Sequence, residues 1–428
     1  MTADAVVSLS ARRPPSAPAQ RGDWAERQTG EILSRPFVRE FVFRNVRTMD
    51  GGTPHQVGDF LILHRGSGIL VEQKCQEDPT TRNPAKTELW ARKKAKQGWN
   101  QLRRALARHK ERPIWCDHER RGRVEFPDGL PVIRQGVVIL EVLRAVDLQP
   151  DAQSLPLDFR GIPITYLSVN DFLNLTVSLR TVPELTEYLD ARRSLPHEDL
   201  RTIGDEKTLF QFYLLNGGSF AGCVGRADAR ITVVAQQHHV HELLQRKAEA
   251  DRYASVLEYV ADCLATRHPD FAADLPASVL AAYDPTDQRR NYLEMQAELA
   301  DLRLRERAEL GRALHNASER LAGETEGFVF MSARLDSKPE WVYIFASSKR
   351  VERNAIMSRI TPLMRGALAY YEKRRCLLVL DRNGVSFEVA LSAPDFNPTL
   401  ADFEIGQRLF GHLRVTSTPM ELVPERHA

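Results

Sequence analysis

The stretch Val57–Lys74, VGDFLILHRGSGILVEQK, decides the fold of the first half of the chain. Two short apolar runs flank Arg65–Gly66, a dipeptide that favours a two-residue hairpin turn because glycine adopts positive φ without strain. A turn centred there pairs residues whose numbers add up to 131. The pattern therefore predicts a β-hairpin in which Asp59 lies directly opposite Glu72.

The predicted hairpin brings two carboxylates and one lysine together. The Cβ atoms of Asp59 and Glu72 should lie about 4.5–5.5 Å apart, and Lys74 shares their face because side chains alternate along a strand. Both strands are otherwise apolar, so the two carboxylates would repel each other unless a cation lies between them. Carboxylate oxygens, with other positions left to water and phosphate, are typical Mg²⁺ ligands. We therefore expect a Mg²⁺ site, with Mn²⁺ as a substitute.

Such a site suits phosphodiester hydrolysis. A divalent metal polarises the phosphodiester and generates a hydroxide nucleophile. A lysine beside it orients the water or stabilises developing charge. Asp59 and Glu72 are thus the expected metal ligands, and Lys74 the residue that activates water.

The segments around this hairpin alternate between helix and strand patterns. Their order, α-β-β-β-α-β-β-α, indicates an α/β fold with one central sheet. The expected helices cover residues 23–34, with Asp23 as N-cap, 88–110, and a last segment ending near Arg193; the expected strands cover 37–43, 57–63, 69–71, 137–140 and 164–169.

An aspartate before one apolar strand, followed by E-x-K on the next, resembles the PD-(D/E)xK nuclease superfamily. Within it, the layout is most similar to the nuclease-related domain, NERD. The resemblance covers residues 22–110 well and 111–195 loosely, and it departs from the pattern at Gly58 and Gln73. It implies a restriction-endonuclease-like α/β core that cleaves DNA, with RNA not excluded.

The resemblance also implies roles for single residues. The carbonyl group of Gln73 would join Asp59 and Glu72 as a metal ligand, and Lys74 would be the catalytic lysine. In this family type a helix before the hairpin carries an acid, and a helix after it carries a glutamine.

Two helix positions match those roles, and each has a rival. Glu26 in AERQTGEIL matches the acid of the first helix, with Glu31 as the alternative. Gln97 in KKAKQGWNQL matches the helical glutamine, with Gln101 one turn further on as the alternative.

Two other D-x-K triplets occur in the chain. We interpret Asp205–Lys207 as a loop or helix start and Asp336–Lys338 as a turn between strands, because neither has an acid across a hairpin. The alternative for the 57–74 hairpin itself is an ion triad at a sheet edge. The chain would then be an inactive nuclease-fold protein that binds nucleic acid or acts as a scaffold.

The segment from Arg82 to Arg123 is strongly basic. It holds fourteen Lys or Arg against four acids, in a protein whose net charge is only +2. Such a local excess favours a surface that follows phosphates. Trp90 and Trp99 either stack on bases or lie in the core, and we favour the core. The expected nucleic-acid contacts are Lys93, Lys94, Lys96, Arg103 and Arg104.

The sequence also predicts how the whole chain divides into domains. Residues 1–21 are expected to be a disordered leader, ahead of a nuclease domain at 22–195. Residues 196–323 predict a helical connecting region, and 324–428 a smaller α+β domain. The charged stretch 288–322 fits either a short coiled coil or one long amphipathic helix, which would pair protomers into a homodimer or brace the domains.

The remaining sequence features bear on where the protein is located and on whether it binds zinc. The chain has no apolar run of membrane length and no signal peptide. Its five cysteines contain no C-x-x-C pair, which indicates free thiols in a reducing, cytoplasmic setting. The run His238–Glu242 lacks a second ligand pair and predicts a helix start without zinc. By analogy alone, the function would serve defence against foreign DNA, antiviral defence included, or repair.

Overall fold

The computed structural model describes most of the chain, in two compact units. One unit is 1–248 with 273–281, and the other is 249–272 with 282–428. The predicted leader, the turn Arg65–Gly66, Glu31 and Cys223 lie outside the described residues. These are 26–27, 29–30, 33, 39–64, 67–75, 84–108, 112–120, 122–129, 131–141, 155–196, 199–200, 205–220, 236–267, 288–382, 386–392 and 396–412.

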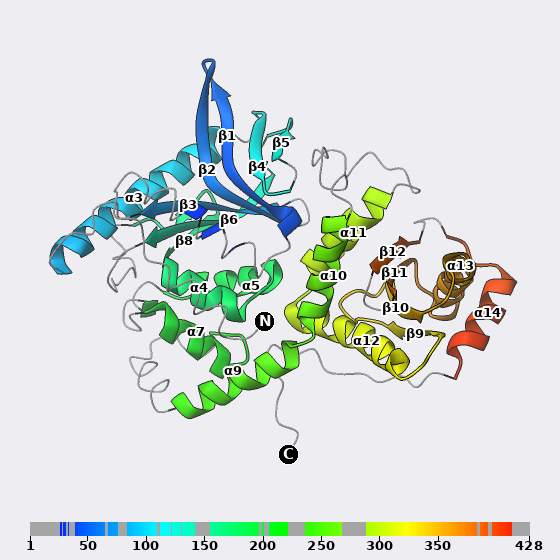
Figure 1. Cartoon of the computed structure of the whole chain (residues 1–428). Coiled ribbons are helices and arrows are strands. Elements are labelled where there is room, and N and C mark those ends of the chain that lie inside the picture. The colour runs from blue at the N-terminus through cyan, green and yellow to red at the C-terminus, as the bar shows by residue number, and fades with distance from the viewer. Residues whose placement is uncertain are drawn as a thin grey trace. The chain divides into compact units, whose positions relative to one another are not determined.

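The first unit is built on an eight-stranded mixed sheet, which confirms the predicted α/β class (Figure 1). Its strand order is β5-β4-β1-β2-β3-β6-β8-β7, with parallel pairing between β3 and β6 and between β6 and β8. The strands are β1 (Val42–Asp50), β2 (Thr53–His64), β3 (Ser67–Cys75), β4 (Ile114–His118), β5 (Gly122–Phe126), β6 (Val132–Glu141), β7 (Asp158–Phe159) and β8 (Ile162–Ser168).

Helices cover both faces of this sheet. Helix α3 (Pro84–Arg108) packs on one face, where its Ala95 and Leu102 share a hydrophobic cluster with Leu70 of β3 and Val138 of β6. Gln135, which points to the opposite face because side chains alternate, donates a hydrogen bond of 2.6 Å to Asp190. That residue belongs to α5 (Val182–Arg193), so α5 lies across the sheet from α3.

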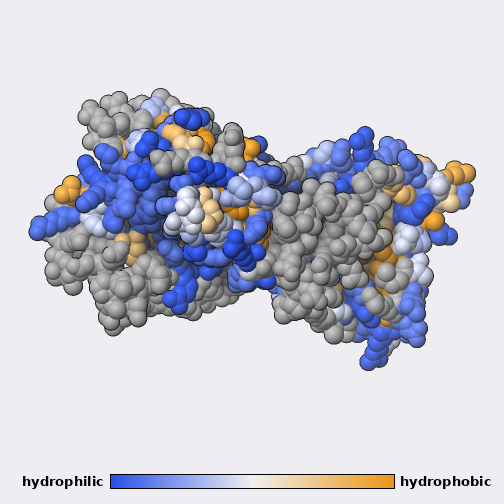
Figure 2. Space-filling model, turned by 90° about the horizontal axis from the view of Figure 1, so that it is seen from above, coloured by the Kyte–Doolittle hydropathy of each residue, from blue (hydrophilic) through white to orange (hydrophobic). Residues whose placement is uncertain are grey.

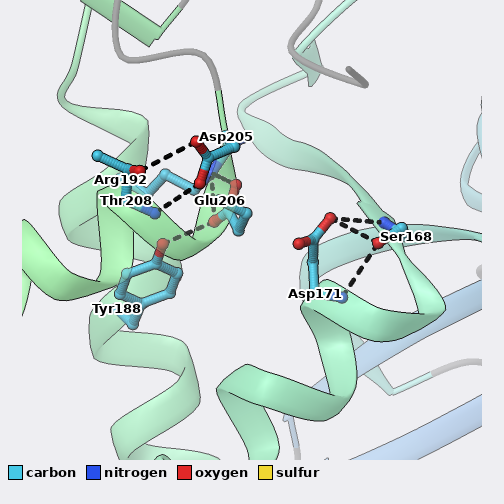
Figure 3. A network of polar contacts seen from close by, with 7 residues as sticks. All are labelled: Ser168, Asp171, Tyr188, Arg192, Asp205, Glu206 and Thr208. Atoms are coloured by element: carbon cyan, nitrogen blue, oxygen red, sulfur yellow. Dashed lines mark hydrogen bonds and ion pairs between the residues drawn. The ribbon is translucent and has the colours of Figure 1, made fainter. Parts of the chain in front are cut away.

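A buried polar network joins the helices on the α5 side (Figure 3). The Glu206 carboxylate, on α7 (Glu206–Leu215), accepts hydrogen bonds from the Tyr188 hydroxyl at 2.6 Å and from Arg192 Nε at 2.9 Å. Asp205 caps α7 by accepting from Thr208 N. The triplet Asp205–Lys207 is therefore a helix start, one of the two structures expected there. Helices α4 (Val169–Ser178) and α9 (Gln237–Asp251) complete this part of the unit.

Two hairpins of the first sheet differ from the prediction. The strand expected at 37–43 begins only at Val42, after a 3-10 turn at Arg39–Phe41, and continues to Asp50. Gly51 and Gly52 both have positive φ, at 57° and 84°, and close a hairpin of β1 and β2 that extends beyond the other strands (Figure 1). The hairpin of β4 and β5 was not predicted, because these strands are short and carry charges.

The second unit has a four-stranded sheet with the order β12-β11-β10-β9. Helix α13 packs on one face, against Ile344 and Leu378. On the other face, Ser318 of α12 donates a hydrogen bond of 2.7 Å to the buried Asp381. The elements are α10 (Ala254–Arg267), α11 (Gln288–Asp301), α12 (Leu304–Ala322), β9 (Gly327–Ala333), β10 (Trp341–Lys349), α13 (Arg353–Tyr370), β11 (Arg375–Arg382), β12 (Ser386–Leu391) and α14 (Leu400–Phe410).

The charged stretch 288–322 forms two helices rather than one, since α11 ends at Asp301 and α12 begins at Leu304. The break falls between two groups of apolar residues, at 292–302 and 310–321, each with helical spacing but out of step with the other. Met295, Leu299, Leu302 and Leu310 are buried, and they line one small pocket together with other residues of the second unit, Leu257 and Val379 among them. The apolar pattern is therefore explained inside one chain, and it gives no support to a coiled coil or a homodimer. The predicted connecting region 196–323 is likewise divided between the two units.

The hydropathy of the surface and the state of the cysteines agree with what the amino-acid composition indicates. Of the residues coloured by hydropathy in Figure 2, most are hydrophilic, and the hydrophobic ones lie in small separate groups. None of the helices in the described part of the chain is long and apolar enough to cross a membrane. Cys75, Cys116, Cys263 and Cys376 are free thiols, as predicted for these four.

Candidate functional site

The β2–β3 hairpin has the register that the sequence predicts. Phe60 pairs with Val71, Leu61 with Leu70, and the pairs continue to His64 with Ser67, each adding up to 131. The Phe60–Val71 pair is the last of this ladder. Asp59 and Glu72 therefore stand one step beyond it, at the point where β2 and β3 part.

The two strands separate at these carboxylates. Beyond Val71, β3 continues its pairing with β6, where Glu72 lies opposite Val138. On the β2 side, the Asp59 carboxylate accepts the backbone N–H of Gln73 at 2.5 Å. A side chain thus replaces the next ladder bond. The opening exists because an acid, rather than a backbone carbonyl, satisfies that donor.

A β-bulge of β1 against β4, between Arg44 and Arg47, lies beside the same opening. Arg44 pairs with Phe60 and Val46 with Gly58, so Asn45 lies at the level of Asp59. Asn45 has a φ of 52°, a left-handed conformation that asparagine tolerates better than most residues. Bulges of this kind redirect side chains next to functional sites. Here the Asn45 amide donates a hydrogen bond of 2.7 Å to Asp117.

Lys74 lies beside the Glu72 carboxylate. Its ammonium group forms an ion pair with Glu72 and donates a hydrogen bond of 2.8 Å to the carbonyl oxygen of Gln73. Its side chain is 12% exposed, against 3% for that of Glu72. Glu72 and Lys74 continue the face of Leu70, the face that α3 covers.

Burial makes the carboxylates unusually basic. Desolvation raises the pKa of Asp59, against the opposing effects of Lys74 and of the Gln73 N–H group. Desolvation, followed by the charge of Asp59, raises the pKa of Glu72 to about 8 despite the ion pair with Lys74. The negative charge of Glu26 raises the Glu72 pKa further. Both carboxyl groups therefore hold a proton more tightly than usual, and a cation that approaches them would compete with that proton.

A cavity of about 220 Å³ opens onto Asp59. Glu26, the predicted acid of the first helix, lines it, and the described residues around it (26–27, 29–30 and 33) are helical. The structure thus brings Glu26 to the same cavity as Asp59. The remaining lining residues are Arg27, Arg44, Asn45 and Phe60.

The two glutamines of α3 lie in different environments. Gln97 is exposed on the helix. Gln101 is half-buried, and its Oε1 atom is buried without a hydrogen-bond partner among the residues that the structure describes. Gln101 is therefore the better candidate for a polar residue directed from α3 towards the sheet.

The basic residues of α3 form a solvent-facing row. Trp90 and Trp99 are half-buried and pack against the hydrophobic cluster of the sheet, as the core interpretation favoured. The guanidinium of Arg103 lies 5.3 Å from the Trp99 ring centre. Of the five predicted contacts, Lys94 is half-buried; those exposed are Lys93, Lys96, Arg103 and Arg104.

The sequence interpretation missed the two arginines and the asparagine of the cavity. In the sequence, Arg44 and Asn45 interrupt the apolar run FVFRNV, which is the one signal that could have indicated them. Their proximity to Asp59 depends on the β1–β2 pairing, which was not predicted.

The side chains at this site can be compared with the ligands that metal ions usually bind. Within the described ranges, no group of three or more His, Cys, Asp or Glu side chains is arranged to hold a metal ion. Mg²⁺, however, is usually bound by one or two carboxylates and keeps several water ligands, which substrate phosphates can replace. Asp59 and Glu72, two buried carboxyl groups at the same opening, fit that requirement, with the Gln73 carbonyl as a further oxygen.

The histidine run lies at the exposed start of α9. The His238 side chain is 88% exposed and lies 3.4 Å from Glu242 within the same helix. His238–Glu242 is thus an exposed helix start, as predicted.

Comparisons of the chain with protein-family models, with curated proteins and with solved structures found no match in any of the three.

Proposed function

We propose that this protein is a Mg²⁺-dependent nuclease that hydrolyses phosphodiester bonds of DNA, with a core of the PD-(D/E)xK type. One observation supports this most. Asp59 and Glu72 lie together at the point where β2 and β3 separate, with the Lys74 ammonium beside them. Defence against foreign DNA or DNA repair is the corresponding biological role by analogy.

Asp59, Glu72 and the Gln73 carbonyl would hold the metal ion, which when bound supplies a more acidic water and a polarised phosphodiester. The residues of the chain then perform the remaining tasks. Lys74 lies against Glu72 and the Gln73 carbonyl, so its ammonium group can donate to the attacking water or to a phosphoryl oxygen. Glu26, on the wall of the same cavity, can accept a hydrogen bond from a water there.

Helix α3 would supply the contacts to the nucleic-acid backbone. It covers the sheet face that carries Glu72 and Lys74, and its outer surface displays exposed lysines and arginines. Such residues bind phosphates without reading sequence. Gln101 would provide the polar contact between this helix and the site, in preference to Gln97.

A second candidate is a nuclease-fold protein without activity that binds nucleic acid or acts as a scaffold. Its support is that Lys74 already satisfies Glu72 and the Gln73 carbonyl, as a purely structural ion triad would. In that case the three residues stabilise the separated strands, and the basic row of α3 retains its binding role.

Cleavage assays separate the two. The wild type, Lys74→Ala and Glu72→Ala would each be incubated with supercoiled plasmid and with single-stranded DNA, in Mg²⁺, Mn²⁺ or EDTA. The matched control is Lys207→Ala, which alters an exposed lysine in a D-x-K triplet that only begins a helix. We expect metal-dependent cutting by the wild type and the control alone.

Two results would reject the enzymatic proposal: a wild type that cuts neither substrate, or site variants that cut as well as the wild type. DNA binding without any cutting would favour the second candidate.

A further inference from the structure

Two positively charged side chains line the cavity beside Asp59, and the proposed metal ligands do not account for their presence. Arg27 and Arg44 line it together with Glu26 and Asp59. Neither guanidinium forms an ion pair with any carboxylate in the part of the chain that the structure describes, although acids share the same cavity. Two arginines available in a partly enclosed space call for an anionic partner.

Arg44 is held in place by the fold. It lies within β1, opposite Phe60 of β2 and Asp117 of β4, so strands on both sides fix its backbone. Its half-buried side chain passes directly over Gly30 of the N-terminal helical segment. A Cβ atom added at Gly30 would come within 2.5–2.8 Å of the guanidinium. A glycine at position 30 therefore leaves the space that the Arg44 side chain occupies.

The charge balance identifies the partner. If Asp59, Glu72 and Glu26 face a divalent cation, the two arginines remain for a group that also binds that cation. A phosphodiester does both, because its oxygens coordinate Mg²⁺ and also match the planar fork of guanidinium donors. A cavity of about 220 Å³ has room for a phosphate with part of its sugar.

We propose that Arg44, assisted by Arg27, binds the backbone phosphate of the nucleic acid next to the metal carboxylates. This rests on the proposed nuclease function and adds to it the residue that positions the substrate. The contact is with the backbone, so it carries no sequence preference. Arg44 is a positioning residue of the site, distinct from the exposed row on α3.

Binding of a fluorescent single-stranded oligonucleotide, measured by anisotropy with Ca²⁺ in place of Mg²⁺, tests this contact without relying on cleavage. We expect Arg44→Ala to weaken binding about tenfold and to lower the slope of log affinity against log salt by about one. Arg44→Lys should fall between it and the wild type, because lysine keeps the charge but loses the fork.

A second variant displaces Arg44 without removing charge. In Gly30→Ala the new methyl group would push the guanidinium away, and only the far end of a flexible side chain has to move. We expect weaker binding at unchanged net charge. The matched control, Arg193→Ala, removes an exposed arginine at the end of α5 that does not line the cavity, and should bind like the wild type.

The outcomes distinguish the two proposals. If the wild type cuts DNA while Arg44→Ala and Gly30→Ala bind as tightly as it does, the role of Arg44 is wrong and the nuclease proposal stands. If Arg193→Ala weakens binding as much as Arg44→Ala, the effect is general charge and the specific contact is also wrong. A wild type that neither binds nor cuts overturns both. Melting curves of all variants establish that each is folded.

Discussion

The Lys74 ammonium group lies on the Glu72 carboxylate and on the neighbouring Gln73 carbonyl, two of the oxygens proposed to bind a metal ion. The single positive charge of Lys74 therefore lies at the place proposed for the doubly charged metal ion. The lysine must move aside, or share these oxygens, when a divalent ion enters. Lys74 is thus both a proposed partner of the ion in the reaction and its competitor for binding.

The competition predicts the behaviour of Lys74→Met. We expect this variant to bind Mn²⁺ more tightly than the wild type, by up to about tenfold, because no ammonium group has to leave the carboxylates. Isothermal titration calorimetry on the metal-free proteins measures this directly. The variant should nevertheless cut no DNA. Equal or weaker Mn²⁺ binding would mean that Lys74 assists the ion in the ground state.

The raised pKa of Glu72 predicts a pH-dependent stability in EDTA. Its pKa is about 8 in the folded protein and 4.5 ordinarily, so the folded state holds the proton more tightly. The stability that this proton provides is present at low pH and is lost as the pH rises from about 5 to above 8. The Glu72→Gln variant has no carboxyl group at this position, so no buried negative charge forms there as the pH rises. We expect the variant to melt at a higher temperature than the wild type at pH 8.5.

The difference in melting temperature should shrink when both proteins are compared at pH 5.5. Each kcal/mol corresponds to about 2–4 °C for a unit of this size. Addition of Mg²⁺ at pH 8.5 should raise the melting temperature of the wild type and leave that of Glu72→Gln nearly unchanged. A difference between the two proteins that is the same at both pH values would contradict the burial of an ionisable Glu72.

The exposed row on α3 predicts an additive loss of phosphate contacts. Replacing Lys93, Lys96 and Arg104 together by alanine should weaken binding to DNA of any sequence and lower the salt slope by about three. Arg92→Ala is the control, because this arginine of the same helix is ion-paired with Glu88 at 2.7 Å. A triple variant with the wild-type salt slope would place the nucleic acid elsewhere.

The buried network on the opposite face predicts a stability effect without an activity effect. Tyr188→Phe removes the hydroxyl that donates to Glu206, while Arg192 stays in place. Hydrogen bonds to charged groups contribute about 1.5–3 kcal/mol. We therefore expect a lower denaturant midpoint and unchanged cleavage. A loss of cleavage in a fully folded variant would link this network to the site.

The register of the β2–β3 hairpin could be predicted because it depends on short-range chemistry. A two-residue turn fixes which residues face each other, and alternation places Lys74 on the face of Glu72. Nothing beyond neighbouring residues was needed. The carboxylate pair was therefore available from the sequence.

The cavity could not be predicted, because it depends on distant residues. Gly30 and Arg44 meet only once the N-terminal segment packs on β1. The β1–β2 turn at Gly51–Gly52 is a recognisable signal, yet the strand ends beside it are exposed and polar, so they lack the apolar alternation that marks a strand. The slip in the 288–322 pattern was visible, but its meaning as a break between two helices depends on packing within the second unit.

The separation of β2 from β3 has a mechanical consequence. On either side of the gap, β2 remains bonded to β1 and β3 to β6, so each half of the sheet is anchored independently. Past the Phe60–Val71 pair, the Asp59 carboxylate is hydrogen-bonded to the Gln73 N–H group across the gap. Loss of this bond would therefore loosen the junction between β2 and β3 at the site, while the ladders on both sides stay intact.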